Sequence, residues 1–569
     1  MAAVIGKDIV CNEVSAPGIE IYKLPGAGSY IWAEDMKGIC GTWSPLCYRD
    51  HSIRQWFNPN STESVYESGA PFMQTYGYDG KNITAAALSD PAARTRIRVS
   101  IDDLNQKDEA VFNVDVSDGE NSGPGETGEI YLRIDRRNID YDEAIRDAAD
   151  WMRSFAGPYP AVPDEAVSPL YSSWYNFHQE PEQELLTKEL KLASELGFRT
   201  VILDDGWQFE GRNTGDYFKA GDWEIARGKF PDFKAFADNV HSFGMKLMVW
   251  FSVPFAGYAT KTFKSLEDKM AFKLDGMRAG VLDIRYREVR EHIIGVFERF
   301  VKEYGIDGLK LDFVDAWRTE PGIAAPYNEA MDIRSLDKAV RVLMREIYER
   351  MTEKNPGFLI EFRQSYIGAE IVRSCNMLRV GDCAADPVTN RIGIAAIRLL
   401  NGRTAPHSDM LLWSKNENPV NCMRQMLNIL FSVPQISVLL TKAPKEQLKA
   451  VKRFIDYWTE NRDVLLGGRF RAVSPTANYS RMSAEKDGRR ISVLYEDGQT
   501  ELSCADEDVW NCTANGYIVA RSRAFAAYRV YDWSGEELET GTIHPGASVI
   551  NVPAGGLVKI KEQVIQGGS

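Results

Sequence analysis

The chain has 569 residues, which exceeds the usual single hydrophobic core of about 250–300 residues and predicts several domains. Hydrophobic residues make up 44% and charged residues 26% of the sequence, a composition that excludes disordered, collagen-like and fibrous proteins. The formal net charge is −14 and no basic run interrupts it. We therefore expect no nucleic-acid partner and no binding to anionic membranes.

The apolar runs are all shorter than the 18 or so residues that a membrane-spanning helix needs. The first ten residues also lack the charged-then-apolar layout of a signal peptide. These two observations predict a cytoplasmic protein.

Three segments with different periodicities follow one another along the chain. Residues 1–162 contain short alternating runs and a helical pattern at 141–155, which predicts a β-sandwich with a linker helix. Residues 163–465 alternate apolar strands with amphipathic helices. Residues 466–569 return to short alternating runs, which predicts a second, antiparallel β-sandwich.

The middle segment predicts a (β/α)₈ barrel. Its candidate strands are 170–175, 200–205, 246–251, 308–313, 358–362, 376–382, a weak one near 405–410, and 434–439. Candidate helices are 181–196, 232–243, 286–304, 327–353, 390–402, 419–431 and 443–461. Eight strands with intervening helices favour a closed barrel, with a doubly wound α/β sheet as the alternative.

Charged side chains stand at the ends of several predicted strands. They are Asp204 and Asp205, Lys310 and Asp312, Glu361 and Arg363, and Arg379 and Asp382. Active sites of such barrels lie at the C-terminal ends of the strands, so this set predicts one site. A single strand-terminal Asp could equally cap the following helix, so the prediction depends on the whole set.

Lys310 and Asp312 are two residues apart, so both side chains point to the same face of one strand, into the barrel. A neighbouring ammonium lowers a carboxylate's pKa, which suits a nucleophile or an electrostatic base. The alternative is a buried ion pair with a structural role only.

Asp382 lacks such a Lys two residues before it, so we expect its pKa to be higher. One ionised and one protonated carboxyl across a pocket is the arrangement that glycoside hydrolysis uses.

Aromatic residues follow the same strand ends and support a sugar site. They are Trp174, Trp207, Trp250 and Trp413. Indole faces pack against the C–H faces of sugar rings, although core packing is the alternative for each Trp taken alone.

Taken together, the motifs resemble the α-galactosidases of glycoside hydrolase family thirty-six and their raffinose-synthase relatives. The matching segments are WYNF at 174–177, VILDDGWQ with RNTGD and GDW behind it, VLDIRYREVREHI, GLKLDF, LRVGD with Asp386-Pro387, and HSDMLLW at 407–413. The resemblance spans about 170–415 and agrees with the three-part layout of that family.

The resemblance implies a retaining double displacement on a terminal α-galactoside. Asp312 would attack the anomeric carbon and Asp382 would act as acid and then as base. Asp204 and Asp205 would hold the O4 and O6 hydroxyls, and Lys310 would hold hydroxyls near the nucleophile. The further implied binding residues are Trp174, Trp207, Trp250, Glu361, Arg363 and Arg379.

Two departures from the family pattern concern the sugar and the acid/base loop. EFRQSYIGAE replaces the Cys- and Gly-rich stretch that lines the pocket beside the sugar's 2-position. The specificity therefore stays open between galactose, N-acetylgalactosamine and another α-sugar. Cys383 stands where a second Asp is frequent, and Asp382 is preferred over Asp386 because it ends the apolar strand.

Other functions are weighed against this one. Asp205, Asp312 and Glu361 could hold Mg²⁺ in an enolase-type enzyme, with Lys310 as base. A sugar-binding protein without catalysis and an α-galactosyl transglycosylase are further alternatives.

We expect neither metal nor cofactor. The His residues show no zinc-site spacing, and no Gly-rich loop in the GxGxxG or Walker A pattern precedes a predicted helix. The expected partners are an oligosaccharide or glycoside substrate and, by the resemblance, other copies of the chain in a homo-oligomer. The N-terminal domain or a neighbouring subunit could complete the pocket.

Overall fold

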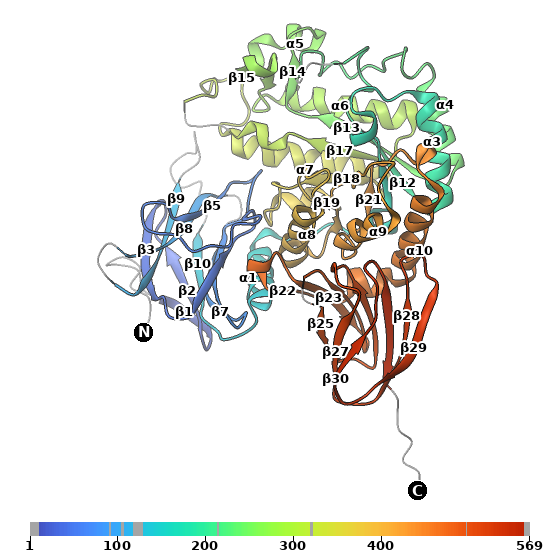
Figure 1. The fold of residues 1–569 in the computed structure, drawn as a ribbon. Coiled ribbons are helices and arrows are strands. Elements are labelled where there is room, and N and C mark those ends of the chain that lie inside the picture. Colours follow the sequence, from blue (N-terminus) through green and yellow to red (C-terminus); the bar gives the residue numbers. More distant parts are fainter. Residues whose placement is uncertain are drawn as a thin grey trace.

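A computed structural model describes residues 11–89, 93–103, 107–117, 129–212, 216–318, 322–496 and 498–562. Asn213, Thr214 and Gly215 of the predicted RNTGD motif lie outside these residues. The chain forms a central barrel with a β-sandwich packed on each of two sides (Figure 1).

The N-terminal β-sandwich pairs a six-stranded sheet with a four-stranded one, and all described strand pairs in both sheets are antiparallel. The first sheet contains, in spatial order, β1 (Cys11–Ala16), β2 (Ile19–Leu24), β10 (Ile130–Asp135), β7 (Asn82–Leu88), β6 (Phe72–Gly77) and β4 (Ile39–Trp43). The second contains β3 (Gly28–Asp35), β9 (Glu109–Ser117), β8 (Arg94–Ile101) and β5 (Asn60–Ser64). Alternating side chains of β8 and β9 are buried between the sheets, as the sequence pattern predicts.

The predicted (β/α)₈ barrel is confirmed. Its parallel strands run around the barrel in sequence order: β11 (Leu170–Ser172), β12 (Thr200–Leu203), β13 (Lys246–Ser252), β17 (Gly308–Asp312), β18 (Leu359–Arg363), β19 (Met377–Arg379), β20 (Ala405–His407) and β21 (Gln435–Ile436). Closure between β20 and the β21 segment uses backbone bonds from Val433 N to Pro406 O (2.7 Å) and from Ser408 N to Val433 O (3.1 Å). The barrel is therefore a closed ring rather than an open doubly wound sheet.

Helices cover the outside of the barrel close to the predicted positions. They are α3 (Gln183–Leu196), α4 (Phe233–Ser242), α6 (Arg287–Tyr304), α7 (Leu336–Lys354), α8 (Pro387–Asn401) and α9 (Pro419–Asn428), followed by α10 (Lys445–Gly467). The prediction of a helix from 327 is wrong, because α7 begins only at Leu336, where the Ser335 side chain accepts a hydrogen bond from Lys338 N.

Two local elements were not predicted. The first strand stops at Ser172, and Trp174–Phe177 forms the short helix α2 instead of extending it. An excursion after β13 forms a small antiparallel sheet of β14 (Phe255–Gly257), β16 (Ala279–Leu282) and β15 (Met270–Leu274), with helix α5 (Lys261–Ser265). Both lie at the C-terminal end of the strands, where loop variation shapes the site.

The C-terminal β-sandwich has a seven-stranded and a three-stranded sheet. The first contains β22 (Arg469–Val473), β23 (Arg481–Lys486), β24 (Arg489–Leu494), β26 (Asp506–Asn511), β31 (Leu557–Glu562), β28 (Ala526–Tyr531) and β29 (Glu537–Ile543). The second contains β25 (Gln499–Glu501), β27 (Ile518–Ser522) and β30 (Gly546–Ile550). Most pairs are antiparallel as predicted, but β24–β26 and β25–β27 are parallel.

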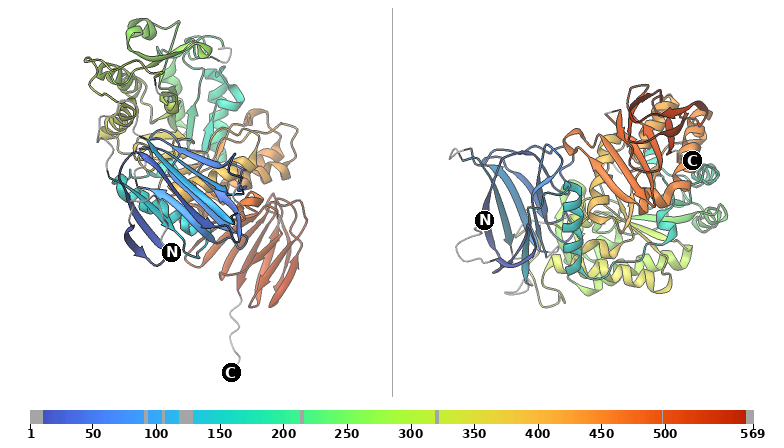
Figure 2. Two further views of the ribbon diagram at one scale, coloured as in Figure 1. Left: turned by 90° about the vertical axis from the view of Figure 1, so that its left-hand side faces the viewer. Right: turned by 90° about the horizontal axis from the view of Figure 1, so that it is seen from below.

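Helix α1 (Tyr141–Ala156) joins the N-terminal sandwich to the barrel, packing on β7 on one side and α8 on the other (Figure 2). It also contacts the start of the C-terminal sandwich, where Arg471 pairs with Asp140 at 2.6 Å and with Asp142 at 2.7 Å. Three parts of the chain therefore meet at this helix.

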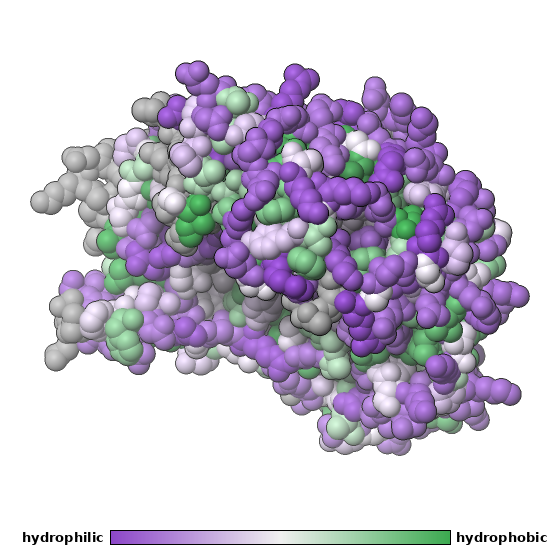
Figure 3. Space-filling model, turned by 90° about the horizontal axis from the view of Figure 1, so that it is seen from above, coloured by the Kyte–Doolittle hydropathy of each residue, from purple (hydrophilic) through white to green (hydrophobic). Residues whose placement is uncertain are grey.

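The face over the α5 region is covered mainly by hydrophilic residues, with hydrophobic ones alone or in small groups (Figure 3). Among the described residues, none of the helices combines the length and the apolar character that crossing a bilayer requires.

Candidate active site

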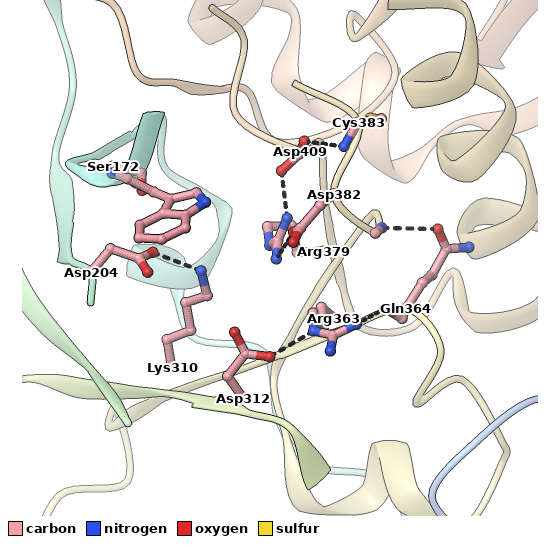
Figure 4. Close-up of polar contacts among 12 residues, drawn as sticks. Ser172, Asp204, Lys310, Asp312, Arg363, Gln364, Arg379, Asp382, Cys383 and Asp409 are labelled. Atoms are coloured by element: carbon pink, nitrogen blue, oxygen red, sulfur yellow. Dashed lines mark hydrogen bonds and ion pairs between the residues drawn. The ribbon is translucent and has the colours of Figure 1, made fainter. Parts of the chain in front are cut away.

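The strand-terminal charges predicted from the sequence gather at one end of the barrel. Parallel register places Trp250 beside Lys310, Ser252 beside Asp312, and Lys310 beside Glu361. Asp204, Lys310, Asp312, Arg363 and the Arg379–Asp382 pair surround one opening (Figure 4). Lys310, Asp312, Arg363 and Arg379 lie on β17, β18 and β19, and Asp204 and Asp382 follow β12 and β19, so the site depends on barrel closure.

Asp312 is 9% exposed and is held by donors on several sides. Its carboxylate accepts hydrogen bonds from Arg363 Nε at 2.6 Å, Trp250 Nε1 at 3.0 Å and Phe313 N at 2.8 Å. Burial alone would raise the pKa of Asp312, but the charges of Arg363 and Lys310 outweigh burial and hold that pKa well below its usual range. Asp312 is therefore an anion at any pH near neutrality.

Lys310 makes its close ion pair with Asp204 rather than with Asp312. The Lys310 Nζ to Asp204 Oδ2 distance is 2.6 Å, and both side chains are buried. Burial lowers the pKa of Lys310, but the charge of Asp204 more than compensates, so the ammonium is maintained. Lys310 still acts on Asp312 through its charge.

Asp205 has a different environment from its neighbour Asp204. Amide groups of Gln179 and Gln208 each donate to it at 2.7 Å. Burial raises the pKa of Asp205 to about 6, although these amide hydrogen bonds act in the opposite direction. Of the two adjacent carboxyl groups, Asp204 is therefore ion-paired, and Asp205 is held by side-chain amides.

Arg379 is fully buried and joins several carboxylates. It is bonded to Asp409, lies 2.9 Å from Asp382 and 3.6 Å from Glu361. Glu361 is itself fully buried and accepts from Gln435 Nε2 at 2.7 Å. Arg379 and Glu361 therefore form the polar layer beneath the opening.

The expectation of a raised pKa for Asp382 is wrong in this structure. The backbone bends after β19, so Arg379, three residues earlier, turns back onto Asp382. The Asp382 side chain is 60% exposed; its partial desolvation in the opening raises its pKa, but the charges of Arg379 and Lys310 outweigh this and the net shift is downward. The charge of Asp312 acts in the opposite direction and opposes the ionisation of Asp382, as expected for two carboxylates around one opening.

The predicted Trp residues separate into two groups. Trp250 is in the site, through its bond to Asp312, and Trp174 is half-buried just beyond β11. Trp207 is not at the opening: it is fully buried, donates to Trp250 O at 3.2 Å, and packs on aromatic rings behind the strands. Trp413 is 8% exposed and donates to Gln447 at 3.2 Å. The assignment of Trp207 to the sugar wall is therefore corrected to core packing.

Two further residues near the opening were not among the predicted site residues: Tyr217 stands in a loop and Tyr175 in the short helix α2. Tyr217 stacks near Trp250 with ring centroids 6.4 Å apart, and the charges of nearby Asp205 and Asp312 add to burial in raising its pKa. Tyr175 donates to Asp409 at 2.9 Å. Tyr175 ends the predicted first strand and belongs to the WYNF segment, so the sequence could have indicated it, whereas no strand end marks Tyr217.

The N-terminal sandwich of the same chain reaches the site. Tyr48 follows β4 in a left-handed conformation, φ 48°, and its hydroxyl lies 3.9 Å from where a Cβ on Gly381 would stand. The next residue, Arg49, holds Asp386 through two contacts of 2.6 and 2.7 Å. Asp386 also caps α8, which agrees with the choice of Asp382 over Asp386.

The alternative Mg²⁺ site is not formed. Within the described ranges, His, Cys, Asp and Glu side chains make no group of three that could hold a metal ion. Asp205, Asp312 and Glu361 instead have separate partners in Gln179, Arg363 and Gln435.

Part of the barrel is similar in sequence to known proteins. Residues 164–370 match the family model described as Melibiase. Alpha-galactosidase Mel36A of Lactobacillus acidophilus is 29% identical over 207 residues, which cover 35% of this chain and 27% of that protein. Alpha-galactosidase AgaA of Geobacillus stearothermophilus is 24% identical over 200 residues, covering 34% and 26%. The match thus spans about a quarter of each relative.

Solved structures match over almost the whole chain. The α-galactosidase from Lactobacillus brevis has a TM-score of 0.64 at 13% identity and covers 97% of this chain and 79% of that one. A doubly substituted variant of AgaA from Geobacillus stearothermophilus, solved in complex with raffinose, has a TM-score of 0.66 at 14% identity and covers 96% and 80%. The predicted resemblance is therefore confirmed by the family segment, and the three-part fold by the structures.

Proposed function

We propose that the chain is a retaining α-galactosidase that releases terminal α-linked galactose by double displacement. Residues 163–465 would form the catalytic domain, with 1–162 and 466–569 as flanking domains. The observation that carries the proposal is that Asp312, held ionised by Arg363 and Trp250, shares one opening with Asp382. Two carboxyls in one pocket are the chemical requirement for this reaction.

In the first step, Asp312 attacks the anomeric carbon while Asp382 gives its proton to the departing glycosidic oxygen. In the second, Asp382 removes a proton from water, whose oxygen displaces Asp312. Protonation of Asp382 breaks its ion pair with Arg379. Because Arg379 also bonds Asp409, its buried charge keeps a counter-ion while the proton is on Asp382.

Asp204, Asp205 and Lys310 would bind the hydroxyls of the galactose. Lys310 and Asp204 form an ion pair, whereas Asp205 accepts hydrogen bonds from two side-chain amides. Trp250 and Trp174 would supply the aromatic wall. Arg363 and Glu361 would act as positioning residues, the first on Asp312 and the second on Arg379.

The substrate class is proposed to be α-galactosyl oligosaccharides and simple α-galactosides. Support comes from the relatives, since AgaA variants were solved in complex with raffinose and with stachyose. A cytoplasmic location and a homo-oligomeric state stay predictions.

A panel of nitrophenyl α- and β-glycosides tests the proposal. We expect the fastest release from the α-galactoside and retention of the α-configuration in the first-formed sugar. A faster rate on the α-N-acetylgalactosaminide would show that the preferred sugar is N-acetylgalactosamine rather than galactose. A dominant transfer product in the presence of sucrose would show that the reaction is transglycosylation rather than hydrolysis. Release of a β-product would contradict the mechanism.

A further inference from the structure

A cavity of about 600 Å³ lies in the C-terminal sandwich, where its two sheets meet. Residues of β23 and β24 line it from the larger sheet and residues of β27 and β30 from the smaller one. None of its lining residues belongs to the barrel. The volume is in the usual range for a small-molecule site.

Arginines dominate the wall of this cavity. Arg481, Arg490, Arg521 and Arg523 line it, and Glu501 is the carboxylate among its lining residues. A second cavity of about 230 Å³ adjoins it, because the two share Arg481, Arg490 and Ser503. Such a concentration of positive charge is unexpected in a chain with a net charge of −14.

Arg490 is held by hydrogen bonds to residues of the loop that forms one wall of the cavity. Its guanidinium donates to Glu507 at 2.7 Å and to Ser503 Oγ at 2.6 Å. Glu507 in turn accepts from the backbone amides of Ser503, at 2.6 Å, and Cys504, at 2.9 Å. One arginine is therefore neutralised and holds the loop that forms the cavity wall.

The other three arginines have no direct partner, although the charges of Glu501 and Glu507 act on Arg481 from a greater distance. Across the described parts of the chain, the guanidinium groups of Arg481, Arg521 and Arg523 have no hydrogen bond or ion pair with a protein group. Burial, followed by the charge of Arg490, lowers the pKa of Arg481. Arg481 is therefore partly buried beside the ion-paired Arg490, and the charges of Glu501 and Glu507 offset the resulting shift only in part. A bound anion would stabilise its charge further.

We propose that this cavity binds a phosphate-bearing small molecule. Guanidinium forks pair with oxyanions through two parallel N–H bonds each. A phosphate monoester has about two negative charges and three free oxygens, enough for the three unpaired forks, whereas a carboxylate has one charge and two oxygens. The Ser503 and Ser522 hydroxyls and the apolar Ala526 and Ile560 side chains would contact the remainder of the ligand.

Titration calorimetry on the full chain tests this site, with inorganic pyrophosphate, inorganic phosphate and galacturonate as probes. We expect pyrophosphate to bind more tightly than phosphate, galacturonate to bind weakest, and added salt to weaken all three. Failure of pyrophosphate to bind, or tighter binding of galacturonate, would overturn the proposal.

A pair of variants locates the binding. Arg481→Gln/Arg521→Gln should weaken pyrophosphate binding at least about tenfold, because it removes two of the proposed charge-assisted contacts with the phosphate oxygens. The matched control is Arg529→Gln, an exposed arginine of β28 that lies outside the cavity and should change binding less than about twofold. Equal loss in both variants would assign the binding to general surface charge.

Thermal unfolding and glycosidase activity show whether the double variant still folds and keeps an intact barrel site. The double variant should unfold at the same or a higher temperature, because it removes mutual repulsion between Arg481 and Arg490. Release of nitrophenol from an α-galactoside should be unchanged. The cavity proposal therefore stands or fails separately from the barrel chemistry.

Discussion

The carboxylates on the two sides of the barrel opening differ in their exposure to solvent and in the number of their close partners. On the β17 side, the Asp312 side chain is 12% exposed and accepts hydrogen bonds from Arg363, Trp250 and a backbone amide. On the β19 side, the Asp382 side chain is 60% exposed and its one close partner among the described residues is Arg379. Asp312 is thus held in one protonation state, whereas Asp382 can gain a proton by giving up one contact.

The largest expected effect is that of replacing Asp312, the carboxylate held in the ionised form. Asp312→Asn should lower kcat/KM for every α-galactoside by a factor on the order of 10⁴ or more, because it removes the proposed nucleophile. Steady-state kinetics with nitrophenyl α-galactoside measures this. Asp315→Asn is the matched control, since Asp315 also lies near Arg363, at 3.5 Å. A smaller loss in Asp312→Asn than in the control would contradict the assignment.

Asp382→Ala should have the next largest effect, and the effect should depend on the leaving group. We expect a loss of about 10²–10⁴-fold on unactivated galactosides, the usual contribution of general acid catalysis, and a smaller loss on nitrophenyl substrates. Azide should restore part of the rate and give the α-galactosyl azide, because it attacks the β-linked galactosyl-enzyme intermediate. Asp386→Asn should show neither the leaving-group dependence nor the azide rescue.

A pH profile tests the role of Arg379. The Arg379 charge favours the ionised form of Asp382, so Arg379→Gln should raise the pKa of Asp382. The protonated acid then persists to higher pH, and the alkaline limb of kcat/KM should move upward by about one pH unit.

The same substitution removes the positively charged partner of the buried Asp409, so Arg379→Gln/Asp409→Asn is the companion variant if the single one unfolds. An alkaline limb that stays in place in both variants would show that Asp382 does not set it.

The smallest effect is expected at the indoles. Trp250→Phe removes one hydrogen bond to Asp312 and should lower kcat about tenfold. Trp207→Phe should leave kcat and KM nearly unchanged but lower the free energy of unfolding by about 1–3 kcal/mol, because Trp207 fills the core. Kinetics and denaturant unfolding of both variants distinguish them, and reversed effects would restore Trp207 to the sugar wall.

The sequence was informative wherever one strand determines a side chain's position. The i, i+2 spacing placed Lys310 and Asp312 inside the barrel, and apolar runs located all eight strands. It failed where the backbone turns. Gly206, with φ 109°, directs Trp207 behind the wall, and the bend after β19 brings Arg379 onto Asp382.

Contacts between distant segments were also beyond the sequence. Tyr48 and Tyr217 reach the opening from irregular loops, and Arg481, Arg490, Arg521 and Arg523 meet only because two sheets pack together. The absence of a basic run in the sequence therefore did not exclude a basic cavity.

Covalent trapping is the most direct test of the central claim, that Asp312 is the nucleophile. The enzyme is inactivated with an α-galactosyl fluoride carrying a second fluorine that slows release, digested, and examined by peptide mass spectrometry. We expect one added fluorogalactosyl group on Asp312 and none in Asp312→Asn. An adduct on Asp382, Asp204 or any other residue would contradict it.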